Sequence, residues 1–160
     1  MTIKQALKQC NVFSSLDDIA LEQIASLAVE KQYEAGTTIF NEGDNADELL
    51  VLQEGEAVLQ ITVRDVVKQV NKRITVDITN RNSIVGWSAL VEPYIYTLTA
   101  VCLQKTRVLS IDGIKLRKLL LDNKLVGYEI LKELVKVVAS RLNDTRQVLI
   151  SERSLTIKSV

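Results

Sequence analysis

The sequence predicts an α+β fold in which helices at both ends of the chain flank an antiparallel, β-rich middle. Helical periodicity fills residues 1–28 and 112–153, whereas residues 29–111 carry short apolar runs separated by glycine-bearing turns. Turns at intervals of roughly ten residues are typical of a β sandwich or barrel. The chain has 160 residues, of which 47% are apolar and 25% charged, so residues 1–160 can form a single domain with its own core.

The N-terminal part is expected to form two helices. Residues 3–9 have a short helical pattern, and residues 16–28 have a longer one. Ser15 is the expected N-cap of the second helix, with Asp18 three residues further on. Its apolar residues fall near one face of the helix and predict burial against the rest of the domain: Leu16, Ile19, Ala20, Ile24 and Leu27.

The β region is expected to contain strands over residues 37–40, 49–53, 57–63, 66–77, 96–104 and 106–111. Gly36, Gly43 and Gly55 provide the turns between the first of these strands. Residues 57–77 are long for one strand, so they predict a hairpin with a charged tip near residues 64–65.

The stretch 83–100 joins a turn, a short helix and a strand. Gly86 lies in the turn, and residues 87–91 form an apolar helix that Pro93 ends. The alternation of Tyr94, Tyr96 and Leu98 then predicts a strand. A turn that leads into a helix directs backbone N–H groups outward and can hold an anion, so this stretch is the candidate binding site.

The C-terminal part predicts two more helices. Asp112 can cap a helix over residues 114–121, and a long helix follows over residues 125–152. Apolar positions in the long helix recur in steps of four and three, which is a heptad seam, at Leu131, Val135, Val138, Leu142, Thr145 and Leu149. We expect this seam to form a homodimer with a second copy; the alternative is that the same face packs entirely on its own domain.

Composition narrows the classes of function. Twenty basic and twenty acidic residues give no net charge, so neither nucleic acid nor an anionic membrane is an expected partner. Without histidine there is no Ser-His-Asp triad or His-ligated metal site, and the expectation is a protein that is not an enzyme and holds no metal.

The absence of a signal-peptide pattern points to the cytoplasm. Cys10 and Cys102 are expected to be buried free thiols, with a disulfide or redox role as the alternative.

The spacing of glycines and apolar anchors resembles the first half of a cyclic nucleotide-binding domain. The matching pattern is Tyr33-x-x-Gly36-x-x-Ile39-Phe40-x-Glu42-Gly43-Asp44, followed by Leu49-x-Val51-Leu52-x-x-Gly55-x-x-Val58. The helix before this pattern, the Gly86 turn and the two closing helices also lie where that family has them. The resemblance implies an antiparallel β jelly-roll barrel that binds its ligand inside. A short helix with its preceding turn, the phosphate-binding cassette, would hold the cyclic phosphate.

The resemblance places the ligand-contacting residues in the cassette: Gly86, Trp87, Ser88, Ala89, Tyr94, Tyr96 and Thr97. The family usually has Glu after the cassette glycine and an Arg that pairs with the phosphate. Here Trp87 follows Gly86, Tyr94 and Ile95 stand near the Arg position, and no Arg or Lys occurs between Arg81 and Lys105.

We therefore expect a stand-alone regulatory or sensor domain that binds cyclic AMP or cyclic GMP weakly or not at all. Another small anionic ligand remains open, and no other cofactor is expected. The alternative is a dimeric scaffold, without a ligand, that docks an unidentified effector protein. An open polar cavity in the barrel would favour the sensor, and a barrel filled by Trp87 and tyrosines would favour the scaffold. Too few residues follow Glu152 for a helix-turn-helix, so DNA binding is not expected.

Overall fold

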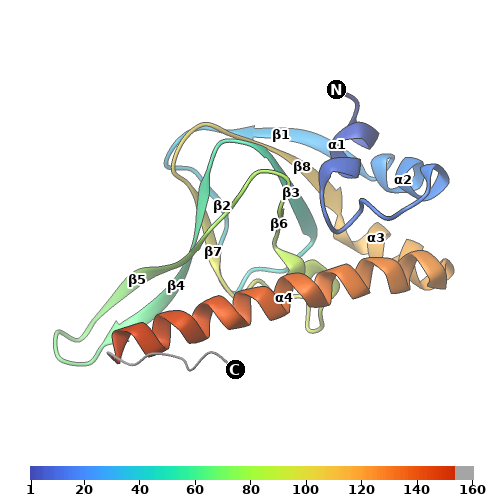
Figure 1. Cartoon of the computed structure of the whole chain (residues 1–160). Coiled ribbons are helices and arrows are strands. Elements are labelled where there is room, and N and C mark those ends of the chain that lie inside the picture. The colour runs from blue at the N-terminus through green and yellow to red at the C-terminus, as the bar shows by residue number, and fades with distance from the viewer. Residues whose placement is uncertain (154–160) are drawn as a thin grey trace.

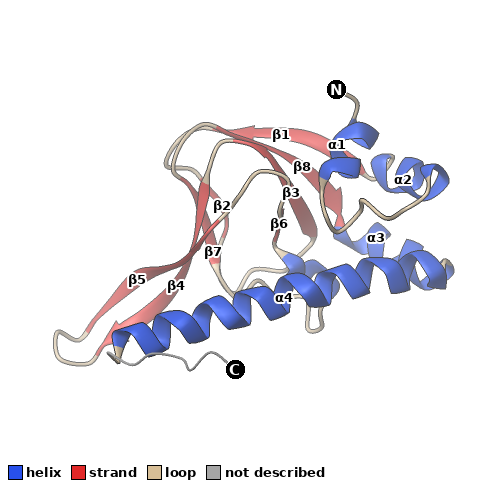
Figure 2. Ribbon diagram, viewed as in Figure 1, coloured by secondary structure: helices blue, strands red, loops and turns tan. Residues whose placement is uncertain are grey.

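The computed structural model describes residues 1–153 and confirms the α+β class (Figure 1). Two four-stranded antiparallel sheets, in the orders β1-β8-β3-β6 and β2-β7-β4-β5, form a jelly-roll-like sandwich that is not closed into a barrel. Figure 2 shows the first three α-helices gathered at one end of the sheets. The helices are α1 Ile3–Gln9, α2 Asp18–Ala25, the 3-10 helix η1 Trp87–Leu90, α3 Gly113–Asp122 and α4 Lys124–Glu152. The strands are β1 Ala28–Tyr33, β2 Thr38–Phe40, β3 Glu48–Glu54, β4 Ala57–Asp65, β5 Val70–Ile78, β6 Ile84–Val85, β7 Thr99–Cys102 and β8 Thr106–Asp112.

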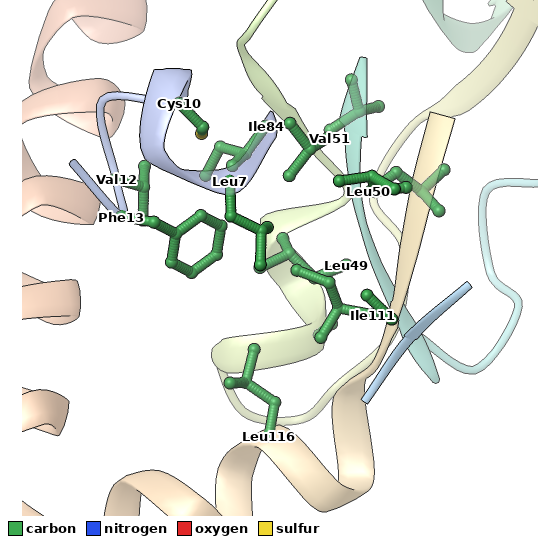
Figure 3. Close-up of a cluster of buried hydrophobic side chains, with 14 of the residues drawn as sticks. Leu7, Cys10, Val12, Phe13, Leu49, Leu50, Val51, Ile84, Ile111 and Leu116 are labelled. Atoms are coloured by element: carbon green, nitrogen blue, oxygen red, sulfur yellow. The ribbon is translucent and has the colours of Figure 1, made fainter. Parts of the chain in front are cut away.

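The core is centred on β3, the strand that lies between β8 and β6. The four consecutive apolar residues Leu49–Leu52 are all buried. A strand that is covered on both faces needs such a continuous apolar run. Figure 3 shows Leu7 and Phe13, from the N-terminal segment, directed toward Leu49 and Ile111. Cys10 and Cys102 are buried free thiols, as predicted.

Helix α2 begins later than the sequence predicted. Its N-cap is Asp17, whose carboxylate accepts a hydrogen bond from the Ala20 N–H at 2.8 Å; the prediction of Ser15 as the N-cap was wrong. Leu16 therefore lies outside the helix, although it is buried, as are the predicted face residues Ala20 and Ile24. Ile19, predicted to be buried, is 73% exposed.

Strands β4 and β5 form the predicted hairpin, which reaches away from the helical end of the molecule (Figure 1). Its turn comprises residues 66–69 rather than 64–65. The Asp65 carboxylate accepts hydrogen bonds from the N–H groups of Val67 and Lys68, which places the turn after Asp65 and keeps residues 64 and 65 in the strand.

Helix α4 follows α3 as predicted and runs along one side of the domain (Figure 1). Asp112 caps α3 by accepting a hydrogen bond from the Lys115 N–H at 3.0 Å. The buried residues of α4 all lie in its N-terminal half: Val126, Gly127, Ile130 and Leu134. None of the helices within residues 1–153 combines the length and the apolar character that crossing a bilayer would require.

Candidate functional site

The cassette consists of the turn at Gly86, helix η1 and the loop that leads to β7. Gly86 has a φ of +79°, and a Cβ atom built on it would lie 2.9 Å from Cε1 of Tyr96. The Gly86 carbonyl oxygen accepts a hydrogen bond from the Ala89 N–H at 3.1 Å, which closes the first turn of η1. The sequence thus predicted the short helix correctly, and the glycine is required by both its backbone conformation and its close approach to an aromatic ring.

The strand predicted from the alternation of Tyr94, Tyr96 and Leu98 does not form. Tyr94 has a φ of +59°, and its N–H donates a hydrogen bond to the Val91 carbonyl at 2.9 Å, so the chain turns back at this point. Ile95 makes only an isolated bridge to Asn45, and the regular strand β7 begins at Thr99. The alternation is therefore the pattern of a loop in which Leu98 is partly buried and one side chain is directed fully inward.

That inward side chain is Tyr96, which is only 6% exposed. Its hydroxyl donates a hydrogen bond to the Glu48 carbonyl at 2.6 Å and accepts one from the Glu48 N–H at 3.3 Å. Its ring stacks on Phe40, with centroids 3.8 Å apart and an angle of 12° between the planes. Burial raises the pKa of Tyr96 to about 12. Tyr96 is thus held at both its ring and its hydroxyl.

The space beneath the cassette is small because the Phe40–Tyr96 ring pair occupies it. The remaining cavity has a volume of about 30 Å³. A cavity needs about 10–15 Å³ of such volume to hold one water molecule, so this one has room for only a few waters at most. Its lining residues are Phe40, Leu59, Gly86, Trp87, Ser88, Tyr96, Thr97 and Leu98.

The structure brings five of the seven candidate ligand-contacting residues to this cavity: Gly86, Trp87, Ser88, Tyr96 and Thr97. Ala89 is fully buried, and its Cβ atom lies against α3 at Gly113. Tyr94 is partly exposed and does not line the cavity. Sequence reasoning treated Phe40 only as a family anchor and missed its role in filling the pocket. Its position at the end of β2, beside the β7 residue Ala100, was the feature that could have indicated this role.

Positive charge reaches the cassette from the C-terminal helices. The guanidinium of Arg117 in α3 lies over the Tyr94 ring, and that of Arg141 in α4 lies over the Trp87 ring. Burial lowers the pKa of Arg141. Neither contact could be read from the sequence, because each arginine is more than twenty residues from the ring that it covers. Within residues 1–153, no group of three or more His, Cys, Asp or Glu side chains is placed to hold a metal ion.

Comparison with known proteins places this arrangement in a family. The family model for the cyclic nucleotide-binding domain matches residues 30–123. The Anaerobic regulatory protein of Bacillus subtilis is 29% identical over 127 residues, which is 77% of this chain and 51% of that protein. This chain therefore spans about half the length of that curated relative.

Solved structures agree with the family match. A Geobacter metallireducens protein described as a cyclic nucleotide-binding protein shares 31% identity with a TM-score of 0.77, over 89% of this chain and 99% of its own. The regulatory subunit of a cAMP-independent protein kinase A from Trypanosoma brucei has the same fold, with 17% identity and a TM-score of 0.72, over 94% of this chain and 50% of its own. The chain belongs to the cyclic nucleotide-binding domain family.

Proposed function

We propose that this chain is a regulatory domain that works without tight binding of cyclic nucleotide and acts as a dimeric docking scaffold for an effector protein. The observation that carries the proposal is the filled pocket beneath the cassette, where the Phe40–Tyr96 ring pair leaves about 30 Å³. Pockets for small molecules and cofactors usually measure about 300–1,000 Å³. A nucleotide would have to displace both rings and break the hydrogen bonds of the Tyr96 hydroxyl to Glu48.

The charge in the cassette supports the same proposal. A cyclic phosphate that enters an apolar site loses hydration, and an Arg side chain usually compensates with paired, charge-assisted hydrogen bonds. Removing one partner of a buried charge pair costs about 3–5 kcal/mol, or roughly 10²–10⁴ in affinity. Trp87 stands at the position where the family has its Glu, and Ile95 stands near the position of its Arg. Both charged contacts are therefore absent from this segment.

One structural relative gives a precedent. The Trypanosoma brucei regulatory subunit is that of a cAMP-independent kinase, and the form bound to cAMP in its A site carries three substitutions, one of which introduces an arginine. Its identity to this chain is low, so it shows only that the fold occurs in a cAMP-independent regulatory protein. The curated Bacillus subtilis relative is likewise a regulatory protein, and we assign this chain no catalytic role.

The dimer part of the proposal is based on helix α4. Four residues of α4 face the domain: Ile130, Leu134, Val137 and Arg141. The residue after each of them belongs to the seam, so the seam lies about 100° further round the helix than the domain-facing side. The five apolar seam residues remain 39–66% exposed in the single chain: Leu131, Val135, Val138, Leu142 and Leu149. Thr145 in the same seam is also exposed. A heptad seam with this much exposed apolar surface fits a second copy of the same helix.

The nucleotide part is tested by thermal or urea unfolding with 1 mM cyclic AMP or cyclic GMP. A ligand present at 1,000 times its Kd stabilises the folded state by about 4 kcal/mol. We expect a stabilisation below about 0.5 kcal/mol, which corresponds to a Kd near or above 1 mM. A stabilisation near 4 kcal/mol would refute the proposal.

The dimer part is tested by sedimentation velocity on the full chain and two variants. Leu142→Lys places a charge in the seam, whereas Gln147→Lys places the same charge on the opposite side of α4. We expect the wild type and the Gln147 variant to sediment as dimers and the Leu142 variant as a monomer. A monomeric wild type at high micromolar concentration would show that the seam does not pair.

A sensor for a different small ligand is the second candidate function. The observation that favours it is a polar groove of about 720 Å³ between the loop after α1, the segment that joins β5 to β6, and α4. Arg81, Asp77, Glu133 and Arg141 bring both signs of charge to this groove. Stabilisation of the chain by a small anion in a thermal-shift panel, and its loss in an Arg81→Gln variant, would favour the sensor over the scaffold.

A further inference from the structure

The cassette contains no cation of its own, yet each of its two partly exposed aromatic side chains is covered by an arginine from a C-terminal helix. The guanidinium carbon of Arg117 lies 3.9 Å from the centroid of the Tyr94 ring. That of Arg141 lies 5.1 Å from the centroid of the Trp87 ring. Both distances are within the range of about 6 Å at which a cation is attracted to the face of an aromatic ring.

Arg117 ties helix α3 to the cassette through two contacts. Besides covering Tyr94, its Nη1 atom donates a hydrogen bond to the Ala89 carbonyl at 2.7 Å. This carbonyl belongs to the last turn of η1, where backbone oxygens have no partner within the helix. The start of α3 is fixed independently, because the Gly113 N–H donates to the Asp47 carbonyl at 2.7 Å. Arg117 therefore reaches the cassette from an anchored helix.

Arg141 ties the second half of α4 to the same region. Within residues 135–153 no side chain is fully buried, so apolar packing contributes little to holding this half against the domain. Arg141 lies two turns beyond the buried Leu134 and on the same side of the helix. Its guanidinium forms an ion pair with Asp77 of β5, and only 19% of its side chain remains exposed. It is the main polar link from this half of α4 to the sandwich.

We infer that Arg117 and Arg141 form a clamp that holds α3 and α4 against the cassette. The rings of Trp87 and Tyr94 provide the two faces on which the clamp closes. This inference rests on the proposed function in one respect: the clamp keeps α4 in one position, so that its seam is available to a second copy without any ligand. The contact itself is measured without any nucleotide.

Trp87 is the only tryptophan of the chain, so its fluorescence reports directly on the clamp. The test compares the wild type with Arg141→Gln and with Arg146→Gln, which removes the same charge from an exposed position of α4. Quenching by acrylamide measures the access to Trp87, and hydrogen exchange measures the opening of residues 138–150. Far-UV circular dichroism confirms that each variant remains folded.

We expect Arg141→Gln to increase the acrylamide quenching of Trp87 and to speed amide exchange in residues 138–150 by about tenfold. Arg146→Gln should leave both values at the wild-type level. The inference is overturned if the Arg141 variant matches the wild type, or if the Arg146 variant changes as much as the Arg141 variant does.

A second variant, Arg117→Gln, tests the other half of the clamp in the same assays. Exchange should then increase in α3 and η1, while residues 138–150 change less than in the Arg141 variant. An unchanged exchange rate in α3 and η1 would show that Arg117 does not hold α3 against the cassette. Tight binding of cyclic AMP by the wild type would refute the proposed function but leave these readouts as they are, so the two failures are distinguishable.

Discussion

Replacing Phe40 by alanine is the perturbation that tests the filled pocket most fully. Phe40 is 9% exposed and supplies one of the two stacked rings beneath the cassette. Moving a buried Phe side chain into water costs about 1.5–3 kcal/mol. A ring-sized cavity of roughly 80 Å³ adds about 2 kcal/mol at about 24 cal/mol per Å³. Because the site lies beside the exposed Thr97 and can partly collapse or admit water, we expect a total loss of about 3–4 kcal/mol of unfolding free energy.

The assay is urea unfolding of the wild type, Phe40→Ala and Phe40→Leu, followed by titration of each protein with cyclic AMP. The leucine control keeps most of the volume and should lose roughly 1 kcal/mol. A loss below about 1 kcal/mol for Phe40→Ala would mean that the ring does not fill the pocket. The alanine variant should still bind cyclic AMP weakly, because space alone does not restore the missing charge. Micromolar binding by Phe40→Ala would refute the charge argument.

Two further predictions concern the same site. Burial raises the pKa of Tyr96 to about 12, so the folded chain holds the phenolic proton more tightly than the unfolded chain does. The stability that this shift contributes below pH 10 is lost between about pH 10 and 12, and it amounts to about 2–3 kcal/mol. In urea unfolding, Tyr96→Phe should therefore lose less unfolding free energy than the wild type over this pH range, by about that amount. An equal loss in both proteins would contradict this. Adding Trp87→Glu and Ile95→Arg to Phe40→Ala supplies a carboxylate at the family's Glu position and a guanidinium near its Arg position, as well as space. Calorimetry should then show cyclic AMP affinity at least roughly 10² times that of Phe40→Ala. No gain in affinity would show that another feature excludes the ligand.

Much of the fold could be predicted because local patterns and tertiary packing agree. The β3 run of four apolar residues, the Asp112 cap and the helical periodicity of α4 each point to one local structure, and each of these structures forms. The errors occur where a side chain bonds to the backbone in a way that periodicity does not show. Asp17 rather than Ser15 caps α2, and Asp65 accepts two turn N–H groups that move the hairpin tip.

The site was less predictable because it is assembled from segments far apart in the chain. The family resemblance located the Gly86 turn and the short helix that follows it, and both form. It could not show that Phe40 and Tyr96 meet, because their contact depends on a loop with a positive φ at Tyr94. It also could not show that Arg117 and Arg141 cover the cassette rings, since those contacts depend on how α3 and α4 return to the sandwich.

The central claim is that the pocket of this domain is filled and lacks the charge that a cyclic phosphate needs. Calorimetric titration of the wild-type chain with cyclic AMP and with cyclic GMP tests this claim most directly. We predict no measurable heat of binding, or a Kd near or above about 1 mM for either nucleotide. A Kd below about 1 μM for either nucleotide would contradict the claim, since about 8 kcal/mol of binding free energy would then have to come from a small cavity whose lining residues carry no charge.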